Sequence, residues 1–373
     1  MSPRAAAEPA CEPWPAPRAN AELVGHEAGE GALLAAALSG RLAHAWLITG
    51  PCGIGKATLA FRFARFLLGH RGAGDGSPAD LGVAAGSPVF RRVASGGHAD
   101  LLTIERGFDD RRERLRKEIV VDDVRAVGAF LAQTPAEGGW RIVVVDKADA
   151  LNRNAANALL KVLEEPPEKA LLLLVSDAPG RLLPTIRSRC RRLALQPLPE
   201  ATVGELLGRY RPDLDEAERR GLAALAEGSI GTALAMADAG AARLQGELRR
   251  LFLSLPALDP AGVHKLCDGL LKQGDDAFAV TSDLIRWWLA RLLRAAAEGG
   301  EEAPGGQGAG LGAGQDAADA GALAAVSRAA PLDRWLEVWD KTTRLLAVVD
   351  SANLDRKQVL LSIFLDIEAT LRR

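Results

Sequence analysis

A glycine-rich turn between an apolar stretch and a helix constrains this chain more than any other feature. The segment WLITG-PCGIGK-AT at 46–58 leads into the helical pattern LAFRFARFL. Its glycines would let the backbone wrap around phosphate oxygens, next to the N–H donors of a helix N-terminus; they are Gly50, Gly53 and Gly55. Lys56 could then reach a β- or γ-phosphate. The pattern predicts a Walker A phosphate loop within a βαβ unit, and the alternative is a glycine turn that holds no ligand.

The phosphate loop lacks a residue that hydrolysis requires. The motif G-x-x-x-x-G-K-[ST] ends in a hydroxyl that ligates Mg²⁺, and this chain has Ala57 there. Thr58 follows, but it would lie about 100° further round the helix. Thr58 could therefore replace the hydroxyl only if the turn shifted.

A second part of the hydrolytic machinery is also replaced. The segment RIVVVDKAD at 141–149 is typical of a Walker B strand, and Asp146 at its end could hold Mg²⁺ directly or through water. The next position usually carries a glutamate that orients the attacking water. Here it is Lys147, which cannot act as a base. We expect negligible independent ATP turnover.

Length and composition favour a helix-rich chain of two or three domains. The chain has 373 residues, 48% of them hydrophobic and only 5% aromatic. The net charge of -2 argues against binding of nucleic acid or an anionic membrane by the chain as a whole. No window approaches the ~20 apolar residues of a membrane helix. The cysteines are far apart, without a C-x-x-C pair, which suits a reducing cytoplasm; they are Cys11, Cys52, Cys190 and Cys267.

The order of apolar runs and helical patterns predicts an α/β domain followed by all-α domains. Runs at 45–49, 101–105, 141–146 and 171–176 alternate with helical stretches, as in a parallel sheet. After Pro199 only helical patterns follow, including Trp287/Trp288 and Trp335/Trp339, for which we expect buried packing. The predicted parts are a disordered lead-in at 1–20, an α/β domain at 21–196 with a flexible excursion at 69–98, a small helical domain at 197–240, and a helical domain at 241–373 with a flexible loop at 298–321.

Several long strings resemble the bacterial clamp-loader subunits of DNA polymerase III, members of the AAA+ superfamily. They are HADLLTIE at 98–105, IVVDDVRAVGAFLAQTP at 119–135, LNRNAANALLKVLEEPPEKALLLLVSD at 151–177 and LLPTIRSRCRRLALQPL at 182–198. The resemblance implies an AAA+ P-loop parallel-sheet domain, a small helical lid domain and a C-terminal helical collar domain. The collar assignment depends on order and helical pattern alone.

Three details resemble the non-motor, delta-prime type of subunit more than the gamma/tau motor type. They are Ala57, Lys147 and the segment GSIGTAL at 228–234, where the motor's second-sensor arginine would fall at Gly231. The resemblance implies a subunit that helps to load the sliding clamp onto primer–template DNA during replication. Its implied partners are the gamma/tau motor subunits and the delta subunit, within the DNA-directed DNA polymerase holoenzyme.

The resemblance also assigns a role to Arg189. In this family the motif Ser188-Arg189-Cys190 carries an arginine that reaches into the neighbouring subunit's nucleotide site. A planar, permanently charged guanidinium can stabilise the charge that develops on a γ-phosphoryl group. The alternative is a solvated basic face shared with Arg187, Arg191 and Arg192.

No metal or cofactor is predicted to be required. Relatives commonly carry a cysteine-ligated zinc module after the first helix, but residues 69–98 contain no cysteine. His70 and His98 alone cannot form a four-ligand site, so we expect no zinc. Whether the Lys56 cradle holds ATP or ADP as a structural ligand stays open.

Two rival functions use the same phosphate loop. A self-sufficient motor ATPase of the gamma/tau type would need Thr58 to replace the missing hydroxyl and another acid, such as Asp149, to act on water. A P-loop kinase for a small metabolite would need an arginine-rich lid. The sequence after Pro199 has no such pattern.

Overall fold

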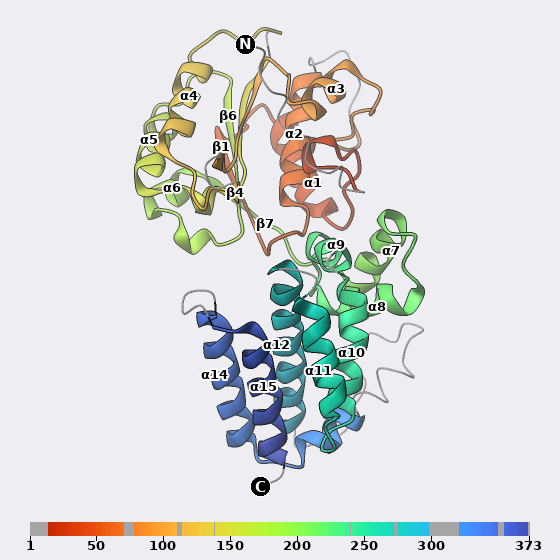
Figure 1. Ribbon diagram of the computed structural model, residues 1–373. Helices are drawn as coiled ribbons and strands as arrows, with labels where there is room; N and C mark the ends of the chain where they lie inside the picture. The colour runs from red at the N-terminus through yellow and green to blue at the C-terminus, as the bar shows by residue number, and fades with distance from the viewer. Residues whose placement is uncertain are drawn as a thin grey trace, which may run out of the picture. The chain divides into compact units, whose positions relative to one another are not determined.

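The computed structural model describes residues 14–70, 78–109, 114–137, 139–238, 240–271, 275–297, 321–349 and 354–371. The chain divides into two compact units (Figure 1). The first comprises Met1–Arg211 and Glu227–Thr232, and the second comprises Pro212–Ala226 and Ala233–Arg373. The division into an α/β domain, a lid and a collar remains a prediction.

The first unit is built around a five-stranded parallel sheet with the order β2-β5-β6-β1-β7. Every residue of β1, β5 and β6 is buried, as in sheets covered on both faces. The mixed α/β class and all four predicted strands are confirmed. The edge strand β7 was not predicted, because its sequence RRLA lacks an apolar run. The strands are β1 (Ala45–Thr49), β2 (Leu101–Ile104), β5 (Arg141–Val145), β6 (Ala170–Ser176) and β7 (Arg191–Ala194).

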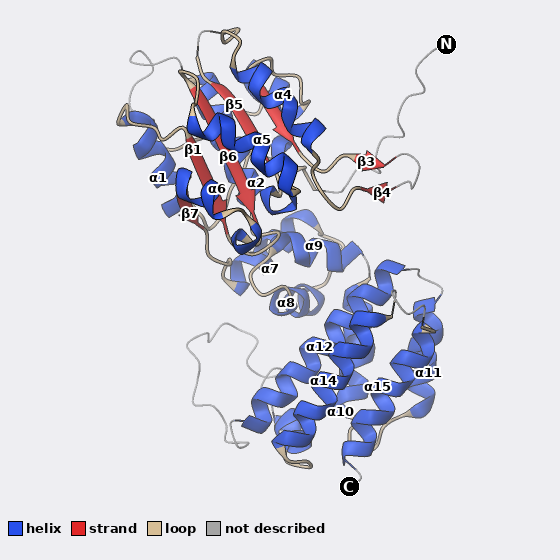
Figure 2. Cartoon of the chain, turned by 90° about the vertical axis from the view of Figure 1, so that its left-hand side faces the viewer, coloured by secondary structure: helices blue, strands red, loops and turns tan. Residues whose placement is uncertain are grey.

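Helices cover both faces of the sheet (Figure 2). Alternate residues along a strand point to opposite faces, so each strand contributes to two cores. Trp46 and Ile48 pack toward one helical layer, whereas Leu47 packs toward the other. The first layer contains α1 (Glu27–Leu38), α2 (Lys56–Gly69) and α3 (Pro88–Ala94); the second contains α4 (Val121–Leu131), α5 (Arg153–Glu164) and α6 (Pro184–Arg189).

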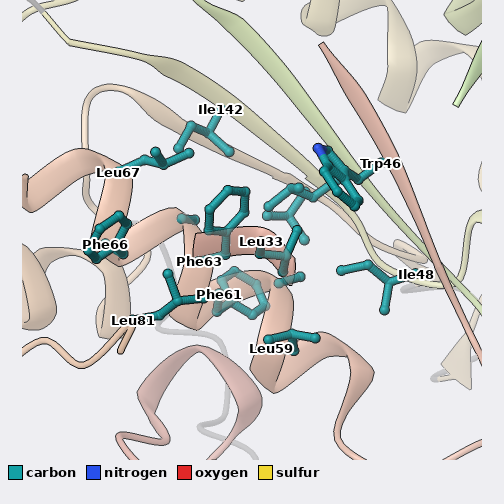
Figure 3. Packing of buried hydrophobic residues seen from close by; sticks show 14 of the residues in the cluster. Leu33, Trp46, Ile48, Leu59, Phe61, Phe63, Phe66, Leu67, Leu81 and Ile142 are labelled. Atoms are coloured by element: carbon teal, nitrogen blue, oxygen red, sulfur yellow. The ribbon is translucent and has the colours of Figure 1, made fainter. Parts of the chain in front are cut away.

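The core of the first layer is rich in aromatic side chains from α2. Phe61, Phe63 and Phe66 lie among aliphatic residues of α1 and the sheet, with Trp46 at the strand side (Figure 3). Leu81, from the connection between α2 and α3, is fully buried in the same cluster. This core holds α2, and with it the phosphate loop, against the sheet.

Two stretches predicted to lack structure are ordered in part. Residues 1–13 and 71–77 lie outside the described residues. The remaining lead-in includes the turn η1 (Pro17–Ala19), and the buried Arg65 donates hydrogen bonds to the carbonyls of Arg18 and Asn20 at 2.8 and 2.6 Å. In the predicted excursion, α3 begins at the N-cap Ser87 and buries Phe90 and Val93. The predicted lack of structure was therefore wrong at Pro17–Ala19 and at Pro88–Ala94. Contacts with α2 order these segments, although their own sequence patterns are weak.

Smaller elements complete the first unit. β3 (Phe108–Asp109) and β4 (Arg114–Leu115) pair antiparallel in a separate two-stranded sheet. The short 3-10 turns η2 (Ala148–Ala150) and η3 (Pro179–Arg181) follow β5 and β6. α7 (Glu200–Tyr210) follows the sheet, in the part of the chain after Pro199 that was predicted to be helical.

The described part of the second unit is helical, as predicted. Trp288 and Phe252 stack at 5.4 Å between ring centroids, and Phe364 lies 6.1 Å from Phe252. Trp335 is buried and its indole N–H donates to the Ser327 carbonyl, so Trp288 and Trp335 are core residues, as expected, whereas Trp287 and Trp339 are only partly buried. The predicted loop at 298–321 lies, except for its last residue, outside the described residues. The helices are α8 (Glu216–Leu225), α9 (Ile230–Asp238, which crosses the boundary between the units), α10 (Ala241–Leu253), α11 (Pro260–Leu271), α12 (Asp275–Ala297), α14 (Leu332–Val348) and α15 (Arg356–Leu371).

Within the described ranges, no helix combines the length and apolar character needed to cross a membrane.

Candidate phosphate loop and arginine site

Three loops of the first unit lie together because they follow parallel strands. The phosphate loop follows β1, Asp146 follows β5, and Asp177 follows β6. The carboxyl ends of parallel strands meet at one edge of a sheet, which is where such folds bind ligands. The structure therefore brings the predicted loop glycines, Lys56 and Asp146 to one edge.

The glycines of the phosphate loop are required by its backbone. Gly53 and Gly55 have φ angles of 73° and 106°, in the region that favours glycine, and Gly55 is the N-cap of α2. Gly50 has φ 151°, and a Cβ atom there would lie 2.7 Å from the Leu195 carbonyl oxygen. The loop thus has the backbone form predicted from the motif.

A segment from the end of the first unit packs directly on this loop. The Gly231 amide donates to the Gly53 carbonyl oxygen at 2.9 Å, and a Cβ on Gly231 would lie 2.9 Å from the Gly53 Cα. A Cβ on Gly53 would lie 2.3 Å from Oγ of Ser229, which also accepts from the Thr232 amide at 3.1 Å. Because Gly53 and Gly231 are in contact, there is no room at position 231 for the second-sensor arginine that a motor subunit would carry there.

Lys56 is buried and its charge is balanced within the chain. Its Nζ lies 2.7 Å from Oδ1 of Asp177 and also donates to the Pro51 carbonyl oxygen. The Lys56 side chain is 3% exposed, so the ammonium needs such partners. Asp177 was not predicted as a site residue, although an acid directly after a buried strand was a usable signal. The loop and Lys56 fit a phosphate group, but a phosphate at Lys56 would compete with Asp177.

The residues that would have to replace the missing magnesium ligand and the missing acid do not fit those roles. α2 starts at Lys56 and is an uninterrupted helix, so no shifted turn brings Thr58 to the place of Ala57. Thr58 is buried instead. Asp149, the other candidate acid, accepts a hydrogen bond at 3.0 Å from the Asp177 amide and so caps the loop after β6.

Asp146 lies in an environment that disfavours its charge. Burial is the main cause that raises its pKa, and the neighbouring negative charge of Glu105 adds to the effect, while the positive charge of Lys147 opposes it. Lys147 has the left-handed backbone angles φ 57° and ψ 56°, which are uncommon for a residue other than glycine. A lysine at this sharp turn supplies positive charge next to Asp146 where hydrolysis would use an acid.

Arg189 is the last residue of α6. Its Nη2 lies 2.7 Å from Oε1 of Glu164, and its Nη1 donates to the Thr185 carbonyl oxygen at 3.1 Å. Cys190, which follows, is buried, and burial raises the pKa of its thiol to about 11, so it stays protonated and acts as an apolar anchor. The backbone at Arg189 is thereby fixed, while the guanidinium is about one-third exposed.

The neighbouring arginines contact the first strand of the sheet. The Arg191 guanidinium lies 4.8 Å from the ring centroid of Trp46, and Arg192 Nε donates to Oγ1 of Thr49 at 3.4 Å. Arg187 and Ser188 are exposed. Arg191 and Arg192 are exposed as well, so the basic cluster is largely solvent-exposed and Arg189 is its partly buried member.

Arg189 and the phosphate loop lie at opposite edges of the sheet. β7 runs parallel to β1 with Arg191 beside Trp46, so Arg189 precedes the first residues of these strands. The phosphate loop follows their last residues, and a five-residue strand spans roughly 16 Å. The structure does not bring Arg189 together with Lys56 or Asp146.

The contact between Gly53 and Gly231 predicts a steric requirement at the loop. Gly53→Ala should lower the stability of the first unit by about 1–3 kcal/mol, because the new Cβ meets Ser229 and the backbone angle is strained. Gly204→Ala is the matched control: it lies in α7 with nothing within 4 Å of its Cβ, and should raise stability by about 0.5–1 kcal/mol. Thermal melting of the full chain measures both, and equal melting of Gly53→Ala and wild type would contradict the requirement.

The raised pKa of Asp146 predicts a pH-dependent effect of its replacement. A carboxyl whose pKa is raised in the folded chain favours folding below its ordinary value of 3.8 and loses that contribution as pH rises through the raised pKa. Asp146→Asn should therefore melt at a higher temperature than wild type at pH 7, and the difference should shrink toward pH 4. A difference between the two melting temperatures that is independent of pH would contradict this reading.

Comparison with known proteins agrees with the motifs. Residues 27–199 match the family model described as DNA polymerase III, delta subunit. A DNA polymerase III subunit delta' from Pseudomonas aeruginosa is 43% identical over 192 residues, 51% of this chain and 55% of that protein. The subunit delta' from Escherichia coli is 36% identical over 204 residues, 55% of this chain and 57% of that protein. A subunit gamma/tau from Mycobacterium tuberculosis is 34% identical over 197 residues, 52% of this chain and 31% of that protein.

The similarity is concentrated in the part of the chain that forms the sheet. The matches span little more than half the length of the delta' relatives. All four strings, at 98–105, 119–135, 151–177 and 182–198, fall within the family match, so the resemblance predicted from them is confirmed. Residues 27–199, just under half of the chain, are therefore similar to the family described as DNA polymerase III, delta subunit.

Proposed function

We propose that this chain is a non-motor subunit of a DNA polymerase III clamp loader and supplies Arg189 in trans to the nucleotide site of a neighbouring subunit. One observation carries the proposal: the chain's own phosphate loop lacks the parts for hydrolysis, while Arg189 lies at the opposite edge of the sheet. Because Arg189 lies so far from its own phosphate loop, any nucleotide that it contacts would have to be bound by another chain.

The chemistry of the arginine supports this role. A guanidinium is planar, remains charged at all relevant pH values, and can donate two parallel hydrogen bonds to a phosphoryl group. An arginine supplied in trans to a phosphoryl-transfer site contributes about 10³–10⁵ in rate in well-studied systems. The contribution is made mainly in the transition state, because the charge that it meets develops during transfer.

The proposed partners follow from the family. They are the gamma/tau motor subunits and the delta subunit, with the sliding clamp and primer–template DNA engaged through the assembled complex in the cytoplasm. The net charge of -2 agrees with DNA contact that is local or shared among subunits. The chain would contribute assembly and trans-activation, and its own loop would serve as a structural element, with or without ATP or ADP.

A motor ATPase of the gamma/tau type is the second candidate, because gamma/tau sequences are similar over the same region. The site disfavours a motor role at both residues that would have to replace the missing groups, Thr58 and Asp149. Thr58 is buried within a regular helix, and Asp149 is engaged by the Asp177 amide. A motor would need Thr58 to leave its buried position and Asp149 to act on water while it accepts the hydrogen bond from the Asp177 amide.

The isolated chain should hydrolyse ATP negligibly, since Ala57 and Lys147 replace a magnesium ligand and a water-orienting acid. Steady-state phosphate release with and without Mg²⁺ measures this, and calorimetry with ATP and ADP tests separately whether the loop still binds nucleotide. Magnesium-dependent turnover that is abolished by Lys56→Ala would favour the motor alternative instead.

Within the reconstituted complex, Arg189→Ala should lower DNA- and clamp-stimulated ATPase while assembly is retained. Assembly should survive because the lost interaction is made mainly in the transition state. Arg189→Lys should restore little activity, since an ammonium keeps the charge without the planar fork. Arg187→Ala is the matched control, because Arg187 is exposed on the same helix.

Gel filtration of the complex and its ATPase rate are the two measurements for Arg189. An intact complex with wild-type ATPase and clamp loading after Arg189→Ala would show that the residue is not a trans-acting arginine. Equal losses from Arg187→Ala and Arg189→Ala would point to a general effect of basic charge on that surface.

A further inference from the structure

The Arg189 guanidinium is held at two points in the isolated chain. Nη2 is 2.7 Å from Oε1 of Glu164, and Nη1 donates to the Thr185 carbonyl oxygen at 3.1 Å. Two contacts on different nitrogens define the plane in which the guanidinium lies. A guanidinium carries five N–H donors, and these contacts use two of them, so three remain for a phosphoryl group.

Glu164 occupies a position where its own helix does not favour a carboxylate. It is the last residue of α5, and the carboxyl end of a helix carries partial negative charge. A negative side chain there is therefore unfavourable for α5 by itself. The nearby positive charge of Arg189 offsets this cost, and the pairing gives the carboxylate a partner from another helix.

The pair is too exposed to contribute much to stability. The side chains of Arg189 and Glu164 are 35% and 49% exposed, and ion pairs in such positions are worth about 0–1 kcal/mol. A contact of this strength can be exchanged when a phosphoryl group arrives. It can nevertheless restrict the rotamers of a long side chain before that group arrives.

Both residues lie at the same edge of the sheet. α5 returns from the end of β5 toward the start of β6, and α6 returns toward the start of β7, so both helices end at the amino-terminal edge of the strands. Glu164 therefore contacts Arg189 from a neighbouring element whose position is set by the sheet and not by α6. The contact with Glu164 therefore fixes the guanidinium relative to the sheet as well as relative to α6.

We propose that Glu164 is a positioning residue that orients the Arg189 guanidinium for the phosphoryl group of a neighbouring subunit. The inference depends on the proposed trans role of Arg189. Glu164 restricts the Arg189 side chain through one N–H of Nη2 and leaves the other N–H donors available. It therefore orients the guanidinium without blocking its contact with a phosphoryl group. Its loss should lower the rate of the neighbouring site and should leave binding of ATP there unchanged.

The first test measures ATPase kinetics of the reconstituted, DNA- and clamp-stimulated complex. Glu164→Ala should lower kcat about two- to fivefold with KM for ATP unchanged, as expected for an orienting contact worth under about 1 kcal/mol. Glu164→Gln retains an acceptor oxygen and should lie between Glu164→Ala and wild type. Glu165→Ala is the matched control: it removes the adjacent exposed carboxylate, which does not pair with Arg189, and should leave kcat unchanged.

A double-mutant cycle links the effect to Arg189. Glu164→Ala should have no further effect on kcat in the Arg189→Ala background, because the residue to be oriented is gone. Additive losses would overturn the proposal by showing that Glu164 acts independently. An unchanged or raised kcat in Glu164→Ala, with Arg189→Ala strongly impaired, would also overturn it while the trans role of Arg189 stood.

The second test does not depend on the trans role. Nitrogen-15 relaxation at Arg189 Nε in the isolated full chain, with the resonance assigned by Arg189→Lys, reports the mobility of the guanidinium. The order parameter should fall in Glu164→Ala and stay at the wild-type value in Glu165→Ala. An unchanged order parameter in Glu164→Ala would overturn the positioning role, whatever the outcome of the Arg189→Ala assays.

Discussion

Burial of the central strands along their whole length is the constraint on which the first unit depends. β1, β5 and β6 are buried at every residue, so each face of the sheet must be covered by helices. The parallel connections supply those helices, because each crossover returns the chain to the starting edge. Two hydrophobic cores result, one on each face of the sheet. One core holds α2 against the sheet and the other holds α5.

This arrangement separates two kinds of residue. Loops that follow strands gather at one edge, where the glycines, Lys56 and Asp146 lie, whereas helix ends gather at the other edge, where Glu164 and Arg189 lie. The first edge has the geometry of a phosphate site without the groups for hydrolysis. The second edge presents an oriented guanidinium to whatever chain lies beside it. The division of roles proposed for this chain follows from that separation.

The phosphate loop has several partners within the first unit. Asp177 balances the charge of Lys56, Asp149 caps the loop that carries Asp177, and Gly231 packs on Gly53. Each contact links the loop to another segment of the first unit. These contacts hold the loop in place without any role in hydrolysis, and the backbone of the loop requires its glycines.

The sequence alone determined the α/β class, four of the five strands of the parallel sheet, the form of the phosphate loop and the defects at Ala57 and Lys147. These features depend on local patterns: apolar runs of strand length, glycines at fixed spacing, and residue types at motif positions. The edge strand β7 and the helix α3 could not be predicted, because their residues are ordered by contacts with β1 and α2 and not by patterns of their own. Only the tertiary structure decided that Asp177 is the partner of Lys56 and Glu164 the partner of Arg189. Lys56 and Asp177 are 121 positions apart in the chain, and Glu164 and Arg189 are 25 positions apart. No local sequence pattern encodes which distant side chains a sheet and its crossover helices bring within 3 Å of each other.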